Sequence, residues 1–413
     1  MELSFKEQAM LRGEMGEPVR NALKLQLEVG KFYGARRFVR VKNVHMMGDI
    51  EVMGDSGLEY LRCTREKRAH CSVDITTNAR CADFAHAEAL GQDMGEIAKE
   101  RTLIGYLADM NVMTTDTCIN YQTLYQPHLG EHVAWGDTGT VIYANSVFGA
   151  RSNFEAGPAA LAAGLTGRTP EYGFHLDEHR RGTFVVKVDA TLGDFAGWGA
   201  LGKIVGESHQ DYFSVPVFDG IGSAPTSDGF KHLGASLASY GSMAMFHMVG
   251  VTPEAPTVEQ ALGGRTSAET MTVRQADIDA VFRRYDIGDG RCNLVVFSGP
   301  QQSLFEMKCL AELFAGKRVH PGSRVFVTTA HSILADARRL GYAQALEAAG
   351  VTILAGVCFY ILQNLSQMRI ANGWTNLVSN SAKLVNTITA HRFNTILRRT
   401  AECVEVAVSG VVK

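Results

Sequence analysis

A single cysteine lies among hydroxyl and amide side chains in residues 114–122, where Cys118 follows Thr117 and precedes Asn120. Residues 143–155 form a second run of small and polar groups. Buried hydroxyls and amides need hydrogen-bond partners, so this composition does not suit a plain apolar core. It suits a site that holds a metal or cluster through one thiolate and orients a small polar molecule. A lyase-type enzyme is therefore the first hypothesis.

Two places carry cations that could hold a substrate carboxylate. Arg151 lies in the second polar run, and a guanidinium binds a carboxylate bidentately; a salt bridge to Glu155 is the alternative. Lys383 and Ser381 follow an apolar run, as in an anion-binding turn, with a solvated loop as the alternative. Elimination of water beside a carboxylate requires a base for the α-proton, an acid for the hydroxyl, and donors that hold the carboxylate.

The clearest positioning elements lie in residues 292–358, where three apolar strands alternate with two helices. We expect strands at 292–297, 324–329 and 351–357, and helices at 304–316 and 333–350. This alternation predicts right-handed crossovers and a parallel sheet, whose ligands gather beyond the carboxyl ends of the strands. Those ends carry residues 298–301, His331 and Cys358. They form a predicted half-site, for which Cys118 is the candidate partner.

Other elements follow from local signals. Ser4 and Glu7 form a capping box, Pro18 begins a second helix, and Pro158 begins a helix that Gly167 ends. The remaining expectations are a strand at 37–41, a loop at 43–49, a helix at 83–110, and a packed internal helix, not a membrane span, within 233–251.

Composition bounds the class of protein. The chain has 413 residues, too many for one core, and a formal net charge of −3, which gives no reason to expect nucleic acid or membrane binding. No secretory signal is visible, so the eight cysteines are expected to be reduced and the protein cytoplasmic. We expect an N-terminal region at 1–260 and a C-terminal region at 261–413, with a doubly wound α/β unit at about 290–372 and a boundary within 254–266.

Several motifs together make the chain resemble the large, catalytic part of aconitase X, a branch of the aconitase superfamily of dehydratases. They are residues 13–16, 45–48, 76–78, 117–118, 134–136, 143–155, 160–173 with His175, 202–206, 252–254 and 380–383. The resemblance implies a multi-domain α/β/α fold with mostly parallel sheets around a central cleft, and an iron–sulfur cluster beside which the substrate is dehydrated. It also implies a small swivelling domain, which we expect on a separate small subunit because we do not find it in this chain.

The chain departs from the family pattern at the cluster. The family has Gly-Cys-Pro-His at the first strand end, whereas this chain has Gly299 in place of the cysteine and Gln301 in place of the histidine. Only Cys118 and Cys358 remain at matched positions. They could hold a [2Fe–2S] or other cluster with Cys292 or His331 as a further ligand, or a mononuclear metal, or the cluster could be lost.

The resemblance adds further candidates to the site. His45 could donate to the substrate or act as the acid. Groups that could orient the substrate are Thr77, Asn78, Asp137, Thr138, Ser146 and Asn153. The first choice of substrate is a small hydroxylated amino acid, best represented by cis-3-hydroxy-L-proline. The alternatives are mevalonate 5-phosphate or another phosphorylated hydroxy acid, and a cluster-deficient isomerase or non-catalytic binding subunit.

Overall fold

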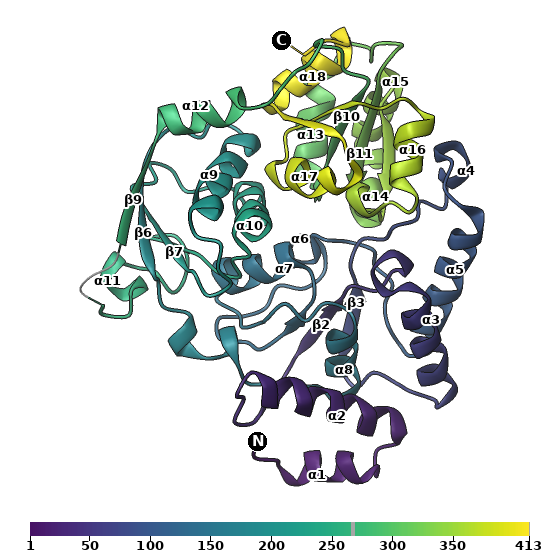
Figure 1. The fold of residues 1–413 in the computed structure, drawn as a ribbon, viewed down its shortest axis with the longest axis vertical. Coiled ribbons are helices and arrows are strands. Elements are labelled where there is room, and N and C mark those ends of the chain that lie inside the picture. Colours follow the sequence, from purple (N-terminus) through teal and green to yellow (C-terminus); the bar gives the residue numbers. More distant parts are fainter. Residues whose placement is uncertain (266–268, 413) are drawn as a thin grey trace.

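The structure, a computed structural model, describes residues 1–265 and 269–412, which form three parallel sheets and one short antiparallel pair (Figure 1). The first part of the chain, at the bottom and right of Figure 1, contains the sheet β3-β2-β4. Its strands are β2 (Asn43–Met46), β3 (Asp74–Thr77) and β4 (Ala134–Trp135). The mixed α/β fold with mostly parallel sheets is as predicted.

Helices surround this first sheet. They are α1 (Phe5–Arg12), α2 (Glu17–Phe32), α3 (Ile50–Glu66), α4 (Ala87–Leu90), α5 (Met94–Asp109), α6 (Asn120–Thr123), α7 (Thr138–Tyr143) and α8 (Pro158–Thr166). The capping box of α1, the proline in the first turn of α2, and the start and end of α8 are confirmed. The predicted strand at 37–41 is β1 (Phe38–Arg40), which pairs with β5 (Arg168–Pro170).

Two local predictions in this part were wrong. The predicted loop at 43–49 contains β2, the central strand of its sheet, which is fully buried because β3 and β4 flank it. The predicted helix at 83–110 is two helices, α4 and α5. The break follows from Gly91, whose left-handed φ of 72° ends α4, and from Asp93, whose side chain caps α5.

The middle part contains the sheet β8-β7-β6-β9. Its strands are β6 (Phe184–Asp189), β7 (Pro216–Asp219), β8 (His247–Met248) and β9 (Glu269–Arg274), and its helices are α9 (Phe195–Ser208), α10 (Ser227–Gly241), α11 (Val258–Ala261) and α12 (Gln275–Arg283). Strand β9 pairs with β6, so this sheet extends beyond residue 260, where we placed a region boundary. Thr266, the last residue of the predicted boundary segment, lies outside the described residues.

Helix α10 is the packed internal helix expected from the small residues after Leu233, although it ends at Gly241 and the following residues include β8. It packs closely on α9, because a Cβ atom at Gly202 would lie 2.7 Å from the Leu233 carbonyl oxygen. Within the described part of the chain, every helix is too short or too polar to cross a bilayer.

The C-terminal part, at the top of Figure 1, is a five-stranded parallel sheet in the order β12-β11-β10-β13-β14. The strands are β10 (Leu294–Gln302), β11 (Arg324–Thr329), β12 (Thr352–Ala355), β13 (Asn376–Ser379) and β14 (Asn394–Leu397). Val295 and Phe297 pack toward α13 (Leu304–Leu313), α14 (His331–Arg339), α15 (Tyr342–Ala349) and α18 (Thr400–Ser409). Leu294 and Val296 pack toward α16 (Leu365–Ala371) and α17 (Ala382–Thr387) on the other face.

This arrangement matches the predicted doubly wound unit, and the sheet continues past residue 372 into β13 and β14. One helix prediction was wrong, because residues 333–350 lie in two helices, α14 and α15. Gly341 separates them with a left-handed φ of 83°, a conformation that a continuous α-helix does not allow.

Candidate active site

The strand order of the C-terminal sheet reverses between β10 and β13, and open parallel sheets bind ligands beyond the carboxyl ends of the strands at such a point. Gln301 lies at the end of β10, and Ser381 and Lys383 follow β13. The hydroxyl of Ser381 donates to the carbonyl oxygen of Gly299, which joins the two strand ends. This edge of the sheet is therefore the expected location of a ligand-binding site.

The two cysteines predicted as ligands meet at this edge. The carboxamide of Gln301 accepts a hydrogen bond from the Cys118 amide (3.2 Å) and donates to the carbonyl oxygens of Asp116 and Val357 (3.2 Å each). The backbone amide of Gln301 donates to the Cys118 sulfur at 3.3 Å. Cys358 directly follows Val357, and the two cysteines are only 6% and 4% exposed. The structure thus places the two cysteines next to each other although they lie far apart along the chain.

Both thiols are protonated at neutral pH in the metal-free protein. Burial raises the pKa of Cys118 to about 11, with a further contribution from the charge of Asp137. Burial also raises the pKa of Cys358 well above its ordinary value, and the neighbouring Cys118 adds to the shift. At neutral pH a bound metal cation would favour the thiolate form of either residue, because it lowers the pKa of the thiol.

A buried lysine and a buried aspartate complete the polar group around the cysteines. Nζ of Lys383 lies 3.7 Å from Oδ2 of Asp137, which also caps α7 by accepting from the amides of Gly139 and Thr140. Burial alone would lower the pKa of Lys383, but its neighbours, first among them the charged Asp137, outweigh burial and raise that pKa above its ordinary value. Lys383 is therefore a cation inside the site.

His45 presents an imidazole nitrogen without a protein partner to the same region. Its Nδ1 lies 2.8 Å from the Thr76 hydroxyl, which donates its own proton to the Val44 carbonyl oxygen (3.4 Å). This arrangement favours the tautomer with the ring proton on Nδ1, in which Nε2, buried without a hydrogen-bond partner among the described residues, carries a lone pair. Burial lowers the pKa of His45 to about 4, although Asp137 and Asn78 favour the protonated form. The ring is neutral at pH 7.

The low pKa of His45 makes the free energy of unfolding depend on pH. His45 has a pKa of about 4 in the folded protein and about 6.5 when unfolded, so acid favours unfolding. The contribution of His45 is fully present above pH 6.5 and is lost as the pH falls from 6.5 to 4, by about 3 kcal/mol. His45→Asn is expected to flatten the free energy of unfolding in this window, as measured by urea denaturation at several pH values. An unchanged slope between pH 6.5 and 4 would contradict the assignment.

Four other predicted site residues are Thr77, Asn78, Thr138 and Ser381. Thr77 supports the site indirectly, because its hydroxyl donates to Asp116 at 2.9 Å, and Asp116 pairs with the buried Arg80. Asn78 donates to the Met47 sulfur, and its side-chain carbonyl oxygen is buried with no hydrogen-bond partner among the residues that the structure describes. Thr138 is half-buried in the first turn of α7, and Ser381 caps α17 by accepting from the Leu384 amide.

Three predicted substrate ligands are held elsewhere. Arg151, predicted to bind the substrate carboxylate, donates to the His175 carbonyl oxygen and pairs with Asp177, not with Glu155 of the alternative prediction. The Asn153 carboxamide is used by Tyr172, Phe174 and Tyr212. Ser146 accepts from the amide of Phe246 in the middle part. The second polar run therefore binds other parts of the protein, and the structure does not bring these side chains to the cysteines.

The predicted further metal ligands do not complete a cluster site. Cys292 precedes β10 and donates to the carbonyl oxygen of Leu294, so it lies at the opposite end of the strand from Gln301, and its proposal as a ligand was wrong. His331 is 61% exposed and faces Asp116 at 3.8 Å. Among the described residues, no group of three or more His, Cys, Asp or Glu side chains could hold a metal ion. The usual iron–sulfur clusters are held by four cysteines, or by two cysteines with two histidines, and among the described residues only the two thiols meet here.

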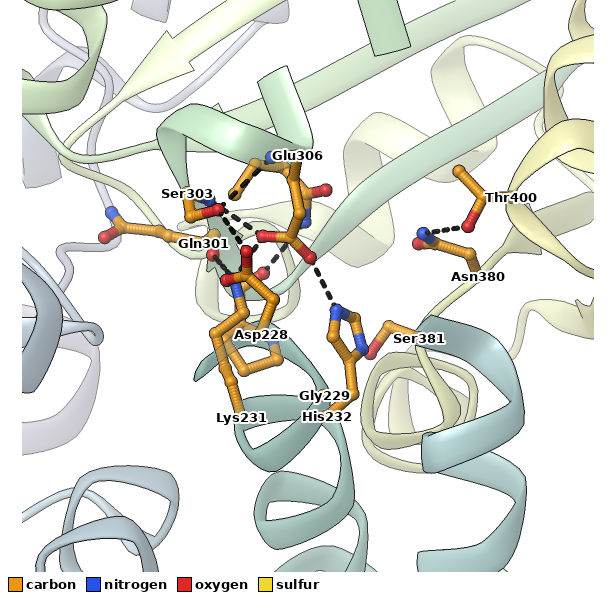
Figure 2. A network of polar contacts seen from close by, with 12 residues as sticks. Asp228, Gly229, Lys231, His232, Gln301, Ser303, Glu306, Asn380, Ser381 and Thr400 are labelled. Atoms are coloured by element: carbon orange, nitrogen blue, oxygen red, sulfur yellow. Dashed lines mark hydrogen bonds and ion pairs between the residues drawn. The ribbon is translucent and has the colours of Figure 1, made fainter. Parts of the chain in front are cut away.

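A buried charged network that was not predicted from the sequence lies next to this site (Figure 2). Lys231 on α10 pairs with Asp228 (3.1 Å) and Glu306, and it donates to the carbonyl oxygen of Gln301 at 3.1 Å. His232 lies 2.7 Å from the other oxygen of Glu306. An available signal was the presence of three polar residues, Asp228, Lys231 and His232, in an otherwise small and apolar segment, which predicts buried pairing.

Comparison with known proteins identifies the family. Models of the first, second and third domains of aconitase X match residues 1–178, 182–283 and 292–409. The chain belongs to the aconitase X family. This family of hydro-lyases includes dehydratases. The crystal structure of the holo-form of Thermococcus kodakaraensis aconitase X is similar, with a TM-score of 0.87 and 30% identity over 98% of this chain and 100% of the other.

Two kinds of aconitase X relative are similar in sequence. The phosphomevalonate dehydratase large subunit of Methanothermobacter thermautotrophicus is 35% identical over 360 residues, which are 87% of this chain and 88% of that protein. The cis-3-hydroxy-L-proline dehydratase of Pseudomonas aeruginosa is 32% identical over 420 residues, which are 98% of this chain and 69% of that protein.

Proposed function

We propose that this chain is the large subunit of a dehydratase that acts on a small hydroxylated amino acid, best represented by cis-3-hydroxy-L-proline. The observation that carries this proposal is Lys383, a buried cation beside two thiols whose nearest acidic group, Asp137, lies at 3.7 Å. That separation exceeds a hydrogen bond, so the ammonium group has donors to offer a substrate carboxylate.

In the proposed reaction, the substrate loses its α-proton and its hydroxyl group and yields an enamine and water, and the enamine then tautomerises to the imine. Lys383 binds the carboxylate, and its charge stabilises the negative charge that develops there when the α-proton leaves. His45 Nε2 is suited to accept a proton, because the ring is neutral and, with its proton on Nδ1, leaves a lone pair on Nε2. This differs from the acid role expected from the sequence, and the remaining proton transfer is assigned to the partner subunit.

A separate small subunit is part of this proposal. Several relatives are named as large subunits, and the chain covers 88% of one of them but only 69% of the P. aeruginosa dehydratase. A cytoplasmic location is also part of the proposal. We do not propose the iron–sulfur cluster that was expected from the sequence, whether of the [2Fe–2S] or another type, because the residues at the site do not fit it.

A phosphorylated substrate is the second candidate, favoured by the 35% identity to a phosphomevalonate dehydratase large subunit. A phosphate group would need further cations near Lys383. The charges of the nearby buried cations are already balanced, Arg80 by Glu100 and Asp116, and Lys231 by Asp228 and Glu306, although Nη2 of Arg80 has no hydrogen-bond partner among the described residues. This argues for the unphosphorylated amino acid.

The test uses the chain co-purified with its small subunit. Turnover of cis-3-hydroxy-L-proline and of mevalonate 5-phosphate is followed by mass spectrometry of the products. We expect kcat/KM for the amino acid to exceed that for the phosphate ester by about 100-fold, since the phosphate would be buried with too few donors. Turnover of the phosphate ester alone would replace the first proposal with the second. A folded complex that turns over neither substrate would favour a non-catalytic binding role.

A further inference from the structure

Gln301 links the two loops that carry the cysteines. Its carboxamide makes three hydrogen bonds, one with the Cys118 amide and one each with the Asp116 and Val357 carbonyl oxygens. A bound cluster would join the same two loops through sulfur, because each loop would contribute a thiolate to it. In this chain a side chain with no affinity for iron makes that connection.

The backbone of Gln301 is also held in place, by a buried charged network. Lys231 donates to its carbonyl oxygen, and Asp228 and Glu306 hold Lys231 in place (Figure 2). Ser303, two residues further along the chain, donates to Asp228 at 2.7 Å. The carboxamide is therefore presented to the cysteine loops by a rigid, buried support.

The position that could provide a third thiolate, residue 299, disfavours a cysteine side chain. Gly299 has a φ of 60°, in the left-handed region that a cysteine rarely adopts. A Cβ atom at Gly299 would lie 3.3 Å from Cβ of Leu384, which is closer than ordinary packing. The Ser381 hydroxyl holds the Gly299 carbonyl oxygen in this conformation. The backbone at residue 299 therefore suits glycine and disfavours cysteine.

We propose that this chain assembles no iron–sulfur cluster and that Gln301 is the positioning residue that holds the Cys118 and Cys358 loops together in its place. The inference is independent of the substrate, because it concerns the composition of the site and the order of the two loops.

The first test measures cluster content. The complex of the chain with its small subunit is purified without oxygen and incubated with ferrous iron, sulfide and a reductant, and iron and acid-labile sulfide are then determined. We expect no acid-labile sulfide and no visible absorption band. Stoichiometric sulfide that disappears in Cys118→Ser and Cys358→Ser would overturn the proposal, whatever the activity of the complex.

The second test measures how Gln301 protects the thiols. Alkylation of Cys118 and Cys358 by iodoacetamide in the folded complex is mapped by mass spectrometry. Gln301→Ala is expected to raise both rates by about 10-fold or more, since loss of each hydrogen bond makes local opening easier. Gln302→Ala is the matched control, because within the described part of the chain its carboxamide bonds only to the Pro300 carbonyl oxygen. Its alkylation rates should equal those of the unmodified protein.

Gln301→Glu provides an isosteric variant should Gln301→Ala fail to fold. It keeps an acceptor for the Cys118 amide but loses both donors, to Asp116 and to Val357. We expect Cys358 to gain more reactivity than Cys118 in this variant. Unchanged alkylation of both cysteines in a folded Gln301 variant would show that Gln301 does not hold the loops.

Discussion

Lys383→Met is expected to lower kcat/KM for dehydration by about 10²- to 10³-fold, the range found when one charged or oriented donor is removed from a developing negative charge. Methionine keeps most of the volume of the side chain but provides no donor for the substrate carboxylate. Lys383 is buried, so a water molecule from bulk solvent does not readily replace its charge.

The matched control is Lys203→Met. Lys203 is another largely buried lysine, but it lies on α9, where it pairs with Glu207 and packs over the Tyr240 ring. Steady-state kinetics of both variants, with circular dichroism to verify folding, separates a role in the site from a general need for a buried lysine. A Lys383→Met enzyme within about 3-fold of the parent, a difference below 1 kcal/mol, would refute carboxylate binding by this residue.

Lys231→Met is expected to lower the free energy of unfolding by about 3–5 kcal/mol, because it leaves Asp228 and Glu306 buried without their common cation. The network joins α10 of the middle part to α13 of the C-terminal part (Figure 2). Its loss therefore weakens the contact between the parts that position Gln301. Urea denaturation followed by circular dichroism measures the effect.

Two comparisons make this second prediction specific. Arg62→Met removes a cation from an exposed ion pair with Glu59 and Glu66 and is expected to leave the unfolding midpoint nearly unchanged. Lys231→Met combined with Asp228→Asn is expected to recover part of the loss, because one unpaired buried charge is then removed. A Lys231→Met protein as stable as the parent would show that the network contributes no net stability.

The convergence of Cys118 and Cys358 could be predicted because it follows from a rule of topology. Alternating strands and helices place the carboxyl ends of parallel strands on one edge, and Gln301, His331 and Cys358 all lie there. The same rule argues against Cys292, which precedes β10 and so belongs to the opposite edge. That error came from counting cysteines without asking at which end of the strand each one lies.

The contacts of individual side chains could not be predicted in this way. Asp177, the partner of Arg151, lies 26 residues away along the chain, and the hydrogen bonds between Gln301 and Cys118 span 183 residues. Contacts between residues so far apart leave no local pattern in the sequence. The composition of residues 143–155 correctly indicated buried polar groups, but whether their partner is a substrate or another loop depends on tertiary packing.

The most direct test of the account is a crystal structure of the complex between this chain and its small subunit with an amino acid substrate bound. The account predicts that the substrate carboxylate lies within hydrogen-bonding distance of Lys383 Nζ, beside Cys118 and Cys358. A carboxylate bound at Arg151, with Lys383 making no contact to the ligand, would contradict it.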